Sequence, residues 1–129
     1  MRETACDRPR VLIADDYPGM VTALRRLLAV DCDVVGSVGD GAALLEAAAR
    51  LQPDIVVLDL HMPHVNGYDA CRQLARLTPR AKVIVLTAAS ETEVQEAVRN
   101  AGASAFIMKH AIADQLLSAI REVYGRGHD

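Results

Sequence analysis

The sequence predicts a doubly wound α/β fold of five strand–helix units, and three observations support this. Short apolar runs recur along the chain, as is typical of strands buried on both faces. Segments with helical spacing of apolar residues separate these runs. The connections are short, and right-handed crossovers leave few other topologies for strict alternation. We therefore expect one parallel sheet with helices on both faces.

The first two units occupy the N-terminal part of the chain. Residues 10–15 and 33–38 are apolar runs bounded by turn-forming residues, and both are predicted strands. The first helix has its apolar stripe at Leu24, Leu27 and Leu28, and the second at Leu44, Ala48 and Leu51. Asp40 is placed to cap the second helix, and Pro53 follows its end.

The other three units repeat this pattern. Strands are predicted at 54–59 and 82–87, and a weaker one at 103–109. Pro79 follows the third helix, and Gly102 provides a left-handed cap after the fourth. The apolar stripes of the three helices are, in order, Ala70, Leu74 and Leu77; Val94, Ala97, Val98 and Ala101; and Leu116, Leu117, Ile120 and Tyr124.

Length and composition predict one soluble domain. The chain has 129 residues, of which 51% are hydrophobic. We expect the domain at 10–125, a flexible N-terminal tail at 1–9, and a C-terminal tail or the start of a linker at 126–129. Net charge is -3 and the basic residues form no stripe, which argues against direct nucleic-acid binding. The apolar runs are too short to span a membrane, and the N-terminus lacks a signal-peptide core, so we expect a cytoplasmic protein. Three widely spaced cysteines without a CxxC pair are expected to be reduced: Cys6, Cys32 and Cys71.

Chemically active side chains gather at the ends of the predicted strands. In such folds, ligands bind beyond the carboxyl ends of the strands, where we expect Asp15, Asp16, Asp59, Thr87 and Lys109. Three converging carboxylates repel one another, so a cation is expected among them, and oxygen ligands favour Mg²⁺ or Mn²⁺. A divalent ion, an ammonium, a hydroxyl and loop amides suit a phosphoryl group. Asp59 is central and is the predicted nucleophile.

The ordered pattern Asp15-Asp16, Asp59-Leu-His-Met-Pro, Thr87-Ala88 and Lys109 resembles the receiver domain of two-component response regulators, over nearly the whole chain. The resemblance implies a CheY-like, flavodoxin-like fold with strand order 2-1-3-4-5. It also implies that Asp59 accepts a phosphoryl group from the phosphohistidine of a sensor histidine kinase or a phosphotransfer protein. Phosphorylation and dephosphorylation would be self-catalysed, with no external substrate turned over.

Further roles follow from the same resemblance. Asp16 and Asp59 would bind Mg²⁺ directly, Asp15 mainly through water, and the carbonyl of His61 would complete the protein ligands. The phosphate would meet Lys109, the Thr87 hydroxyl and the backbone amides of Leu60 and Ala88. Phe106 would take the aromatic switch position, which changes the surface of the fourth and fifth helices. Phosphorylation could also promote a homodimer.

The C-terminal sequence GASAFIMKHAIADQLLSAIREVYGRG resembles receivers attached to a LuxR-type, NarL-like DNA-binding output. A stand-alone receiver or phosphorelay protein is the alternative. A Mg²⁺-dependent aspartyl phosphatase would need a second Asp close after the nucleophile, where this chain has His61. A flavin or nucleotide site would need a phosphate-binding loop after the first strand, where ADDYPG brings two carboxylates instead.

Several residues also have simpler interpretations. Asp15 and Asp16 could cap the helix that begins near Pro18, although their convergence with Asp59 favours a metal site. His61 and His64 are expected to be solvated loop residues and not transition-metal ligands. Phe106 could be ordinary core packing. Many receivers have a cis proline after the active-site lysine, whereas here His110 follows Lys109. We therefore expect a trans peptide, or a rare cis bond held by the neighbouring carboxylates and strand.

Overall fold

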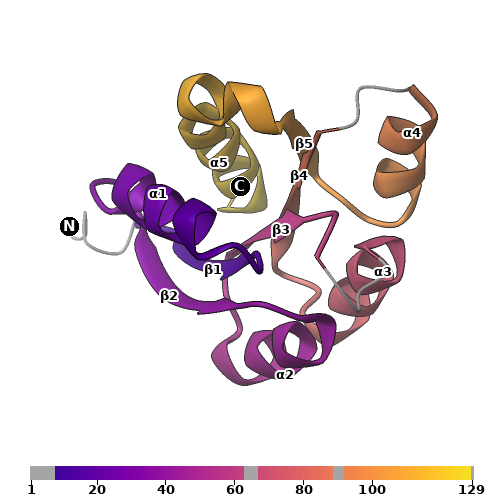
Figure 1. The fold of residues 1–129 in the computed structure, drawn as a ribbon. Coiled ribbons are helices and arrows are strands. Elements are labelled where there is room, and N and C mark those ends of the chain that lie inside the picture. The colour runs from indigo at the N-terminus through magenta and orange to yellow at the C-terminus, as the bar shows by residue number, and fades with distance from the viewer. Residues whose placement is uncertain (1–7, 63–66, 89–91, 129) are drawn as a thin grey trace.

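A five-stranded parallel sheet forms the centre of the protein (Figure 1). The structure is a computed structural model and describes residues 8–62, 67–88 and 92–128. The strand order is β2-β1-β3-β4-β5, which confirms the predicted topology. The strands are, in chain order, β1 (Arg10–Ala14), β2 (Asp33–Val38), β3 (Ile55–Asp59), β4 (Lys82–Thr87) and β5 (Ala105–Met108).

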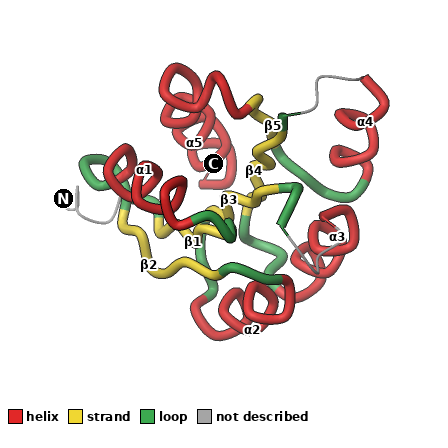
Figure 2. Tube along the Cα trace, viewed as in Figure 1, coloured by secondary structure: helices red, strands yellow, loops and turns green. Residues whose placement is uncertain are grey.

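Helices cover both faces of this sheet. The helices are α1 (Pro18–Leu28), α2 (Gly41–Leu51), α3 (Gly67–Leu77), α4 (Thr92–Asn100) and α5 (Ile112–His128), with the short 3-10 helix η2 (Lys109–Ala111) before α5. In Figure 2, α1 and α5 lie on one side of the strands, and α2, α3 and α4 lie on the other. Because α5 continues to His128, the domain boundary predicted at residue 125 does not coincide with the end of the helix.

The core consists of two layers, one on each face of the sheet. Leu12 and Ala14 of β1 belong to the layer under α2, α3 and α4, whereas Val11 and Ile13 belong to the layer under α1 and α5. Successive strand residues point to opposite faces, so both must be apolar when both faces are covered. This is why the strands appear in the sequence as continuous apolar runs.

The predicted helix ends agree with the structure at two positions. The Asp40 side chain accepts a hydrogen bond of 2.8 Å from the amide of Ala43 and caps α2. Gly102 has φ +115°, a conformation that side-chain-bearing residues rarely adopt, and its amide donates to the Arg99 carbonyl at 3.0 Å. The first contact pairs an amide in the first turn of α2, and the second pairs a carbonyl in the last turn of α4. A helix leaves such terminal amides and carbonyls without the hydrogen bonds of its interior.

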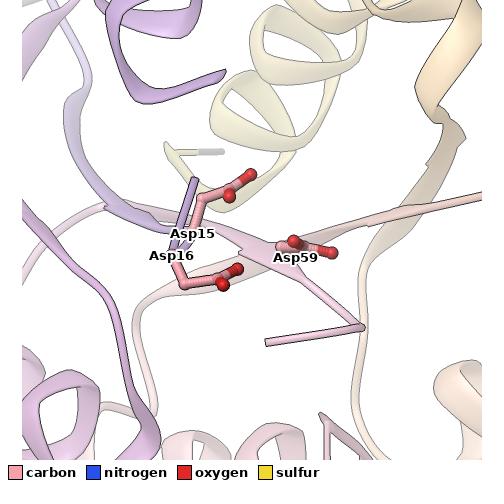
Figure 3. A group of neighbouring side chains, drawn as sticks. All are labelled: Asp15, Asp16 and Asp59. Atoms are coloured by element: carbon pink, nitrogen blue, oxygen red, sulfur yellow. The ribbon is translucent and has the colours of Figure 1, made fainter. Parts of the chain in front are cut away.

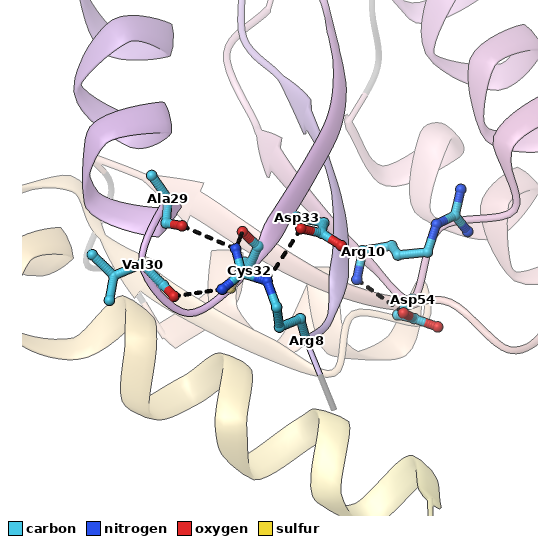
Figure 4. A network of polar contacts seen from close by, with 7 residues as sticks. All are labelled: Arg8, Arg10, Ala29, Val30, Cys32, Asp33 and Asp54. Atoms are coloured by element: carbon cyan, nitrogen blue, oxygen red, sulfur yellow. Dashed lines mark hydrogen bonds and ion pairs between the residues drawn. The ribbon is translucent and has the colours of Figure 1, made fainter. Parts of the chain in front are cut away.

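Two arginines close the C-terminal ends of α1 and α2, and Figure 4 shows the contacts of the first, Arg8. The Arg8 guanidinium donates to the carbonyls of Val30, Ala29 and Cys32 at 2.7, 3.0 and 2.8 Å. Arg10 donates to the carbonyls of Leu51 and Gln52, both at 2.9 Å. Arg8 therefore contacts the folded body, although it lies within the predicted N-terminal tail at 1–9.

Three predicted features can be compared with the structure: one peptide geometry, one helix stripe and the cysteines. The Lys109–His110 peptide is trans, as expected. Leu77 is 45% exposed, although it was assigned to the buried stripe of α3. Cys32 and Cys71 are buried free thiols, and Cys6 lies outside the described residues.

The β1–β2 register shifts so that Val11 pairs with Val34 and Leu12 with Gly36, which leaves Val35 as a bulge.

Candidate functional site

Three carboxylates converge at the carboxyl edge of the sheet, as predicted (Figure 3). Asp59 ends β3, while Asp15 and Asp16 follow the last residue of β1. One oxygen from each of these residues lies within 4.8 Å of the others. Asp15 and Asp59 are buried, at 4% and 3% exposure, whereas Asp16 is exposed. The cluster thus has two fixed members and one that faces solvent.

Asp59 is held by two donors that reach the same oxygen. Its Oδ1 accepts a hydrogen bond of 3.0 Å from the amide of His61 and lies 3.1 Å from Nζ of Lys109. Lys109 is the first residue of η2, not the last residue of β5, so the predicted strand 103–109 is too long at both ends. The ammonium is nevertheless brought to Asp59. It offsets part of the negative charge of the cluster.

Asp15 has one oxygen with a partner and one without. Oδ1 accepts a hydrogen bond of 2.9 Å from the amide of Tyr17, while Oδ2 is buried and has no hydrogen-bond partner. Burial is the main cause that raises the pKa of the Asp15 carboxyl; the Tyr17 hydrogen bond lowers this pKa and the charge of Asp59 raises it further. Leaving such an oxygen unpaired is costly, and a cation would remove that cost.

The donor set fits a hard divalent cation. Carboxylate oxygens are the ligands that Mg²⁺ and Mn²⁺ prefer, and the unpaired Asp15 oxygen is available to one. Within the part of the chain that the structure describes, this is the only cluster of three or more candidate metal ligands found, and His61 is not a member. The exposed side of the cluster, at Asp16, leaves room for the waters that Mg²⁺ usually keeps.

The simpler interpretation of the Asp15-Asp16 pair is wrong. The N-cap residue of α1 is Tyr17, which makes no side-chain cap hydrogen bond, and Pro18 begins the helix. Asp15 instead accepts the Tyr17 amide two residues later, in the same way that Asp59 accepts the His61 amide. Both are Asx turns, in which an aspartate accepts a hydrogen bond from the backbone amide two residues later. The aspartates therefore shape the loops at the site.

The amide of Leu60 is engaged elsewhere. It donates to the carbonyl of Leu86 at 3.0 Å and so extends the pairing of β3 with β4 by one residue. The predicted role of the Leu60 amide as a phosphate donor conflicts with this bond. The amide that faces the Asp59 carboxylate is that of His61. The spacing of an Asx turn was the sequence signal that could have identified it.

The remaining predicted residues surround this group. Thr87 ends β4 and is fully buried, and Ala88 follows it at the same edge. Phe106 is half-buried, pairs with Val85 across the sheet and packs against the layer under α2, α3 and α4. Its packing fits the core interpretation, and the switch role stays a prediction. Pro63 and His64 lie outside the described residues.

An open cavity of about 330 Å³ adjoins the carboxylates. It lies between the start of α1 and the end of β2, and its lining includes Asp15, Asp16, Thr22, Ser37 and Gly39. Pro18, Val21 and Val38 complete the lining, and the open cavity gives solvent a path to the cluster. Small hydrated ions therefore have access to the site.

Comparison with known proteins points to one family. The model of the response regulator receiver domain family matches residues 11–121. Response regulator GacA of Pseudomonas aeruginosa is 35% identical over 117 residues, which are 89% of this chain and 55% of GacA. The nitrate/nitrite response regulator protein NarP of Escherichia coli is 37% identical over 114 residues, or 87% and 53% of the two chains. The chain thus spans about half the length of these relatives.

Solved structures show the same fold. The signal receiver domain of NarL from Mycobacterium tuberculosis superimposes with a TM-score of 0.86 at 26% identity, covering 92% of this chain and 98% of that one. Across the described residues, no helix has the length and apolar character needed to cross a membrane.

Proposed function

The chain belongs to the response regulator receiver domain family, and on that premise we propose that Asp59 is the phosphoacceptor of a two-component signalling pathway. The observation that carries the proposal is the position of Asp59. It is buried at the end of β3, beside two other carboxylates and 3.1 Å from Nζ of Lys109. A carboxylate among compensating charges suits transfer of an anionic group.

The chain's own residues define how the transfer would proceed. His61 and Lys109 both reach Oδ1 of Asp59. With both of these donors on Oδ1, we place the new P–O bond at the other carboxylate oxygen, Oδ2. The P–N bond of a donor phosphohistidine breaks as this bond forms, and the departing imidazole nitrogen keeps the electron pair and takes up a proton. Lys109 is then placed to pair with the phosphoryl oxygens.

The same geometry supports a magnesium requirement. Asp15, Asp16 and Asp59, with the carbonyl of His61, are the residues that would hold Mg²⁺. When bound, Mg²⁺ neutralises charge on the phosphoryl oxygens and on the carboxylates. The unpaired Oδ2 of Asp15 and the raised pKa of its carboxyl are what we expect of a site built around a cation.

We further propose a signalling output on another part of a longer protein. The relatives are response regulators about twice as long as the matched region, and another at 32% identity is the transcriptional regulatory protein DegU of Brevibacillus brevis. Phosphorylation would draw the Thr87 hydroxyl and the Ala88 amide toward the phosphate and change the surface of α4, β5 and α5, with Phe106 as the switch residue. A homodimer or a DNA-binding segment would respond to that surface; a stand-alone receiver remains the alternative.

The test is a mass measurement. The protein is incubated with a small phosphodonor and Mg²⁺, and we expect one adduct of about 80 Da, the mass of a phosphoryl group. Asp59→Asn should abolish the adduct, and Lys109→Ala should slow its formation. Asp33→Asn, a matched change at the opposite edge of the sheet, should leave it intact. An undiminished adduct on Asp59→Asn would refute the proposal.

A further inference from the structure

Four exposed arginines and an exposed leucine lie at or just beyond the C-terminal ends of the neighbouring helices α2, α3 and α4. Arg76 and Leu77 form the last turn of α3, and Arg80 lies in the turn that leads to β4. Arg50 is in the last turn of α2, which packs against α3. Arg99 is in the last turn of α4, and the following Gly102 lies against α3. We call this set the α3 basic surface: Arg50, Arg76, Leu77, Arg80 and Arg99.

Within the described part of the chain, the arginines of this surface form no ion pair with an acidic side chain. The ion pairs that the structure describes use Arg8, Arg72, Lys109 and Arg121. Three acidic side chains at the N-terminal ends of β2 and β3 already have partners. Asp31 pairs with Arg121, Asp33 pairs with Arg8, and Asp54 accepts the Arg10 amide at 2.9 Å. The α3 basic surface is therefore a positive region on a chain of net charge -3.

Helix electrostatics explains only part of this arrangement. Basic residues in a last turn stabilise the negative end of the helix dipole, and this accounts for Arg50, Arg76 and Arg99. It does not account for Arg80, which lies beyond the helix, or for Leu77. Leu77 continues the stripe of Ala70 and Leu74, which are buried, but it is 45% exposed.

An apolar side chain within a charged rim is the arrangement found at protein interfaces. Interfaces have an apolar centre that excludes water and a polar rim, and arginine is enriched there. We propose that the α3 basic surface docks an acidic segment of a protein partner that brings an apolar side chain to Leu77. A nucleic-acid backbone would pair with the arginines but would leave Leu77 unused. Arginine forms bidentate pairs with carboxylates and with phosphates alike, so the exposed Leu77 is what favours the acidic protein segment.

This surface is separate from the phosphoacceptor site. It lies at the C-terminal ends of α2, α3 and α4, whereas Asp59 lies at the carboxyl end of β3. Strands and helices run in opposite directions in a doubly wound fold, so the two regions are at opposite edges of the sheet. Docking here does not require phosphorylation, and its failure would leave the proposed function untouched.

The experiment uses three labelled probes against the whole chain. Two are short acidic helical peptides, identical except that one carries leucines where the other carries serines, and the third is a short DNA duplex. Binding is followed by fluorescence anisotropy and by amide chemical shifts. We expect the leucine peptide to bind most tightly and to shift the amides of residues 50, 76, 77, 80 and 99.

Variants separate charge from apolar contact. The double variant Arg76→Glu/Arg80→Glu should lower the affinity for the leucine peptide by about tenfold or more, because like charges then face each other. The double variant Arg25→Glu/Arg26→Glu, which makes the same charge change in the last turn of α1, should have less than about a twofold effect. Leu77→Ser should lower the affinity for the leucine peptide severalfold and leave the affinity for the serine peptide unchanged.

Three results would overturn the proposal. Equal affinity for the two peptides would show that Leu77 contributes nothing. Tighter binding of the DNA duplex than of either peptide would assign the surface to nucleic acid. Absence of binding by all three probes would identify it as a solvated helix end. All the substituted side chains are exposed, and melting temperatures of the variants should confirm that they fold.

Discussion

Replacing Asp15 with asparagine should stabilise the protein when no divalent cation is present. Asp15 is 4% exposed, its Oδ2 has no hydrogen-bond partner, and its oxygens face two other carboxylates. In Asp15→Asn, Oδ1 can still accept the Tyr17 amide, and the new NH₂ group can donate to a neighbouring carboxylate. The substitution thus removes a buried unpaired charge without changing the size of the side chain.

The expected gain in unfolding free energy is about 1–3 kcal/mol, the usual cost of a buried polar atom without a partner. For a domain of this size, this corresponds to a rise in melting temperature of roughly 3–10 °C. The pKa of Asp15 is raised above 3.8 in the folded state, so the charged form destabilises the protein above that raised pKa. The gain in stability from Asp15→Asn should be complete at pH values above the raised pKa. It should shrink as the pH falls through the raised pKa toward 3.8.

Thermal unfolding with and without Mg²⁺ checks this reasoning. At an ion concentration about ten times Kd, the wild type should gain about 1.4 kcal/mol, and Asp15→Asn should gain much less. Asp16→Asn is the control, because Asp16 is exposed and its replacement should change stability by less than about 0.5 kcal/mol without metal. A melting temperature of Asp15→Asn at or below that of the wild type in chelator would refute the reasoning.

Two further predictions concern the ends of the helices. Arg8→Ala should lower the unfolding free energy by roughly 1–3 kcal/mol in urea titrations, because three carbonyls lose a donor. Arg26→Ala is the control and should not lower it. Equal stabilities of the two variants would contradict the capping role of Arg8. Asp40→Ala should cost about 1 kcal/mol through loss of the α2 cap, and Asp40→Asn, which preserves an acceptor, should recover most of it.

The fold was predictable because its signals are local. Apolar runs, a capping aspartate and a glycine with positive φ each mark an element boundary within a few residues, and the structure agrees at Asp40 and Gly102. Convergence of Asp15, Asp16 and Asp59 followed from topology, since parallel strands end at one edge. These parts of the site required no knowledge of side-chain contacts.

The predictions that differed from the structure depend on contacts between distant segments. The Leu60 amide is engaged because β4 places the Leu86 carbonyl next to it, which local sequence cannot show. Leu77 has the phase of a buried residue, and only the position of the helix end relative to the sheet exposes it. Arg8 was assigned to a tail because its carbonyl partners belong to the α1–β2 turn, more than twenty residues along the chain.

The bulge at Val35 has a consequence for the behaviour of the protein at high concentration. β2 is at the end of the sheet, and its outer side leaves backbone groups that a strand from another molecule could recruit. The extra residue twists this strand locally, and the Arg25 guanidinium reaches Ser37 of the same strand at 3.2 Å. A bent strand with a cation beside it is a poor template for intermolecular sheet growth. The irregularity thus guards against fibril-like self-association.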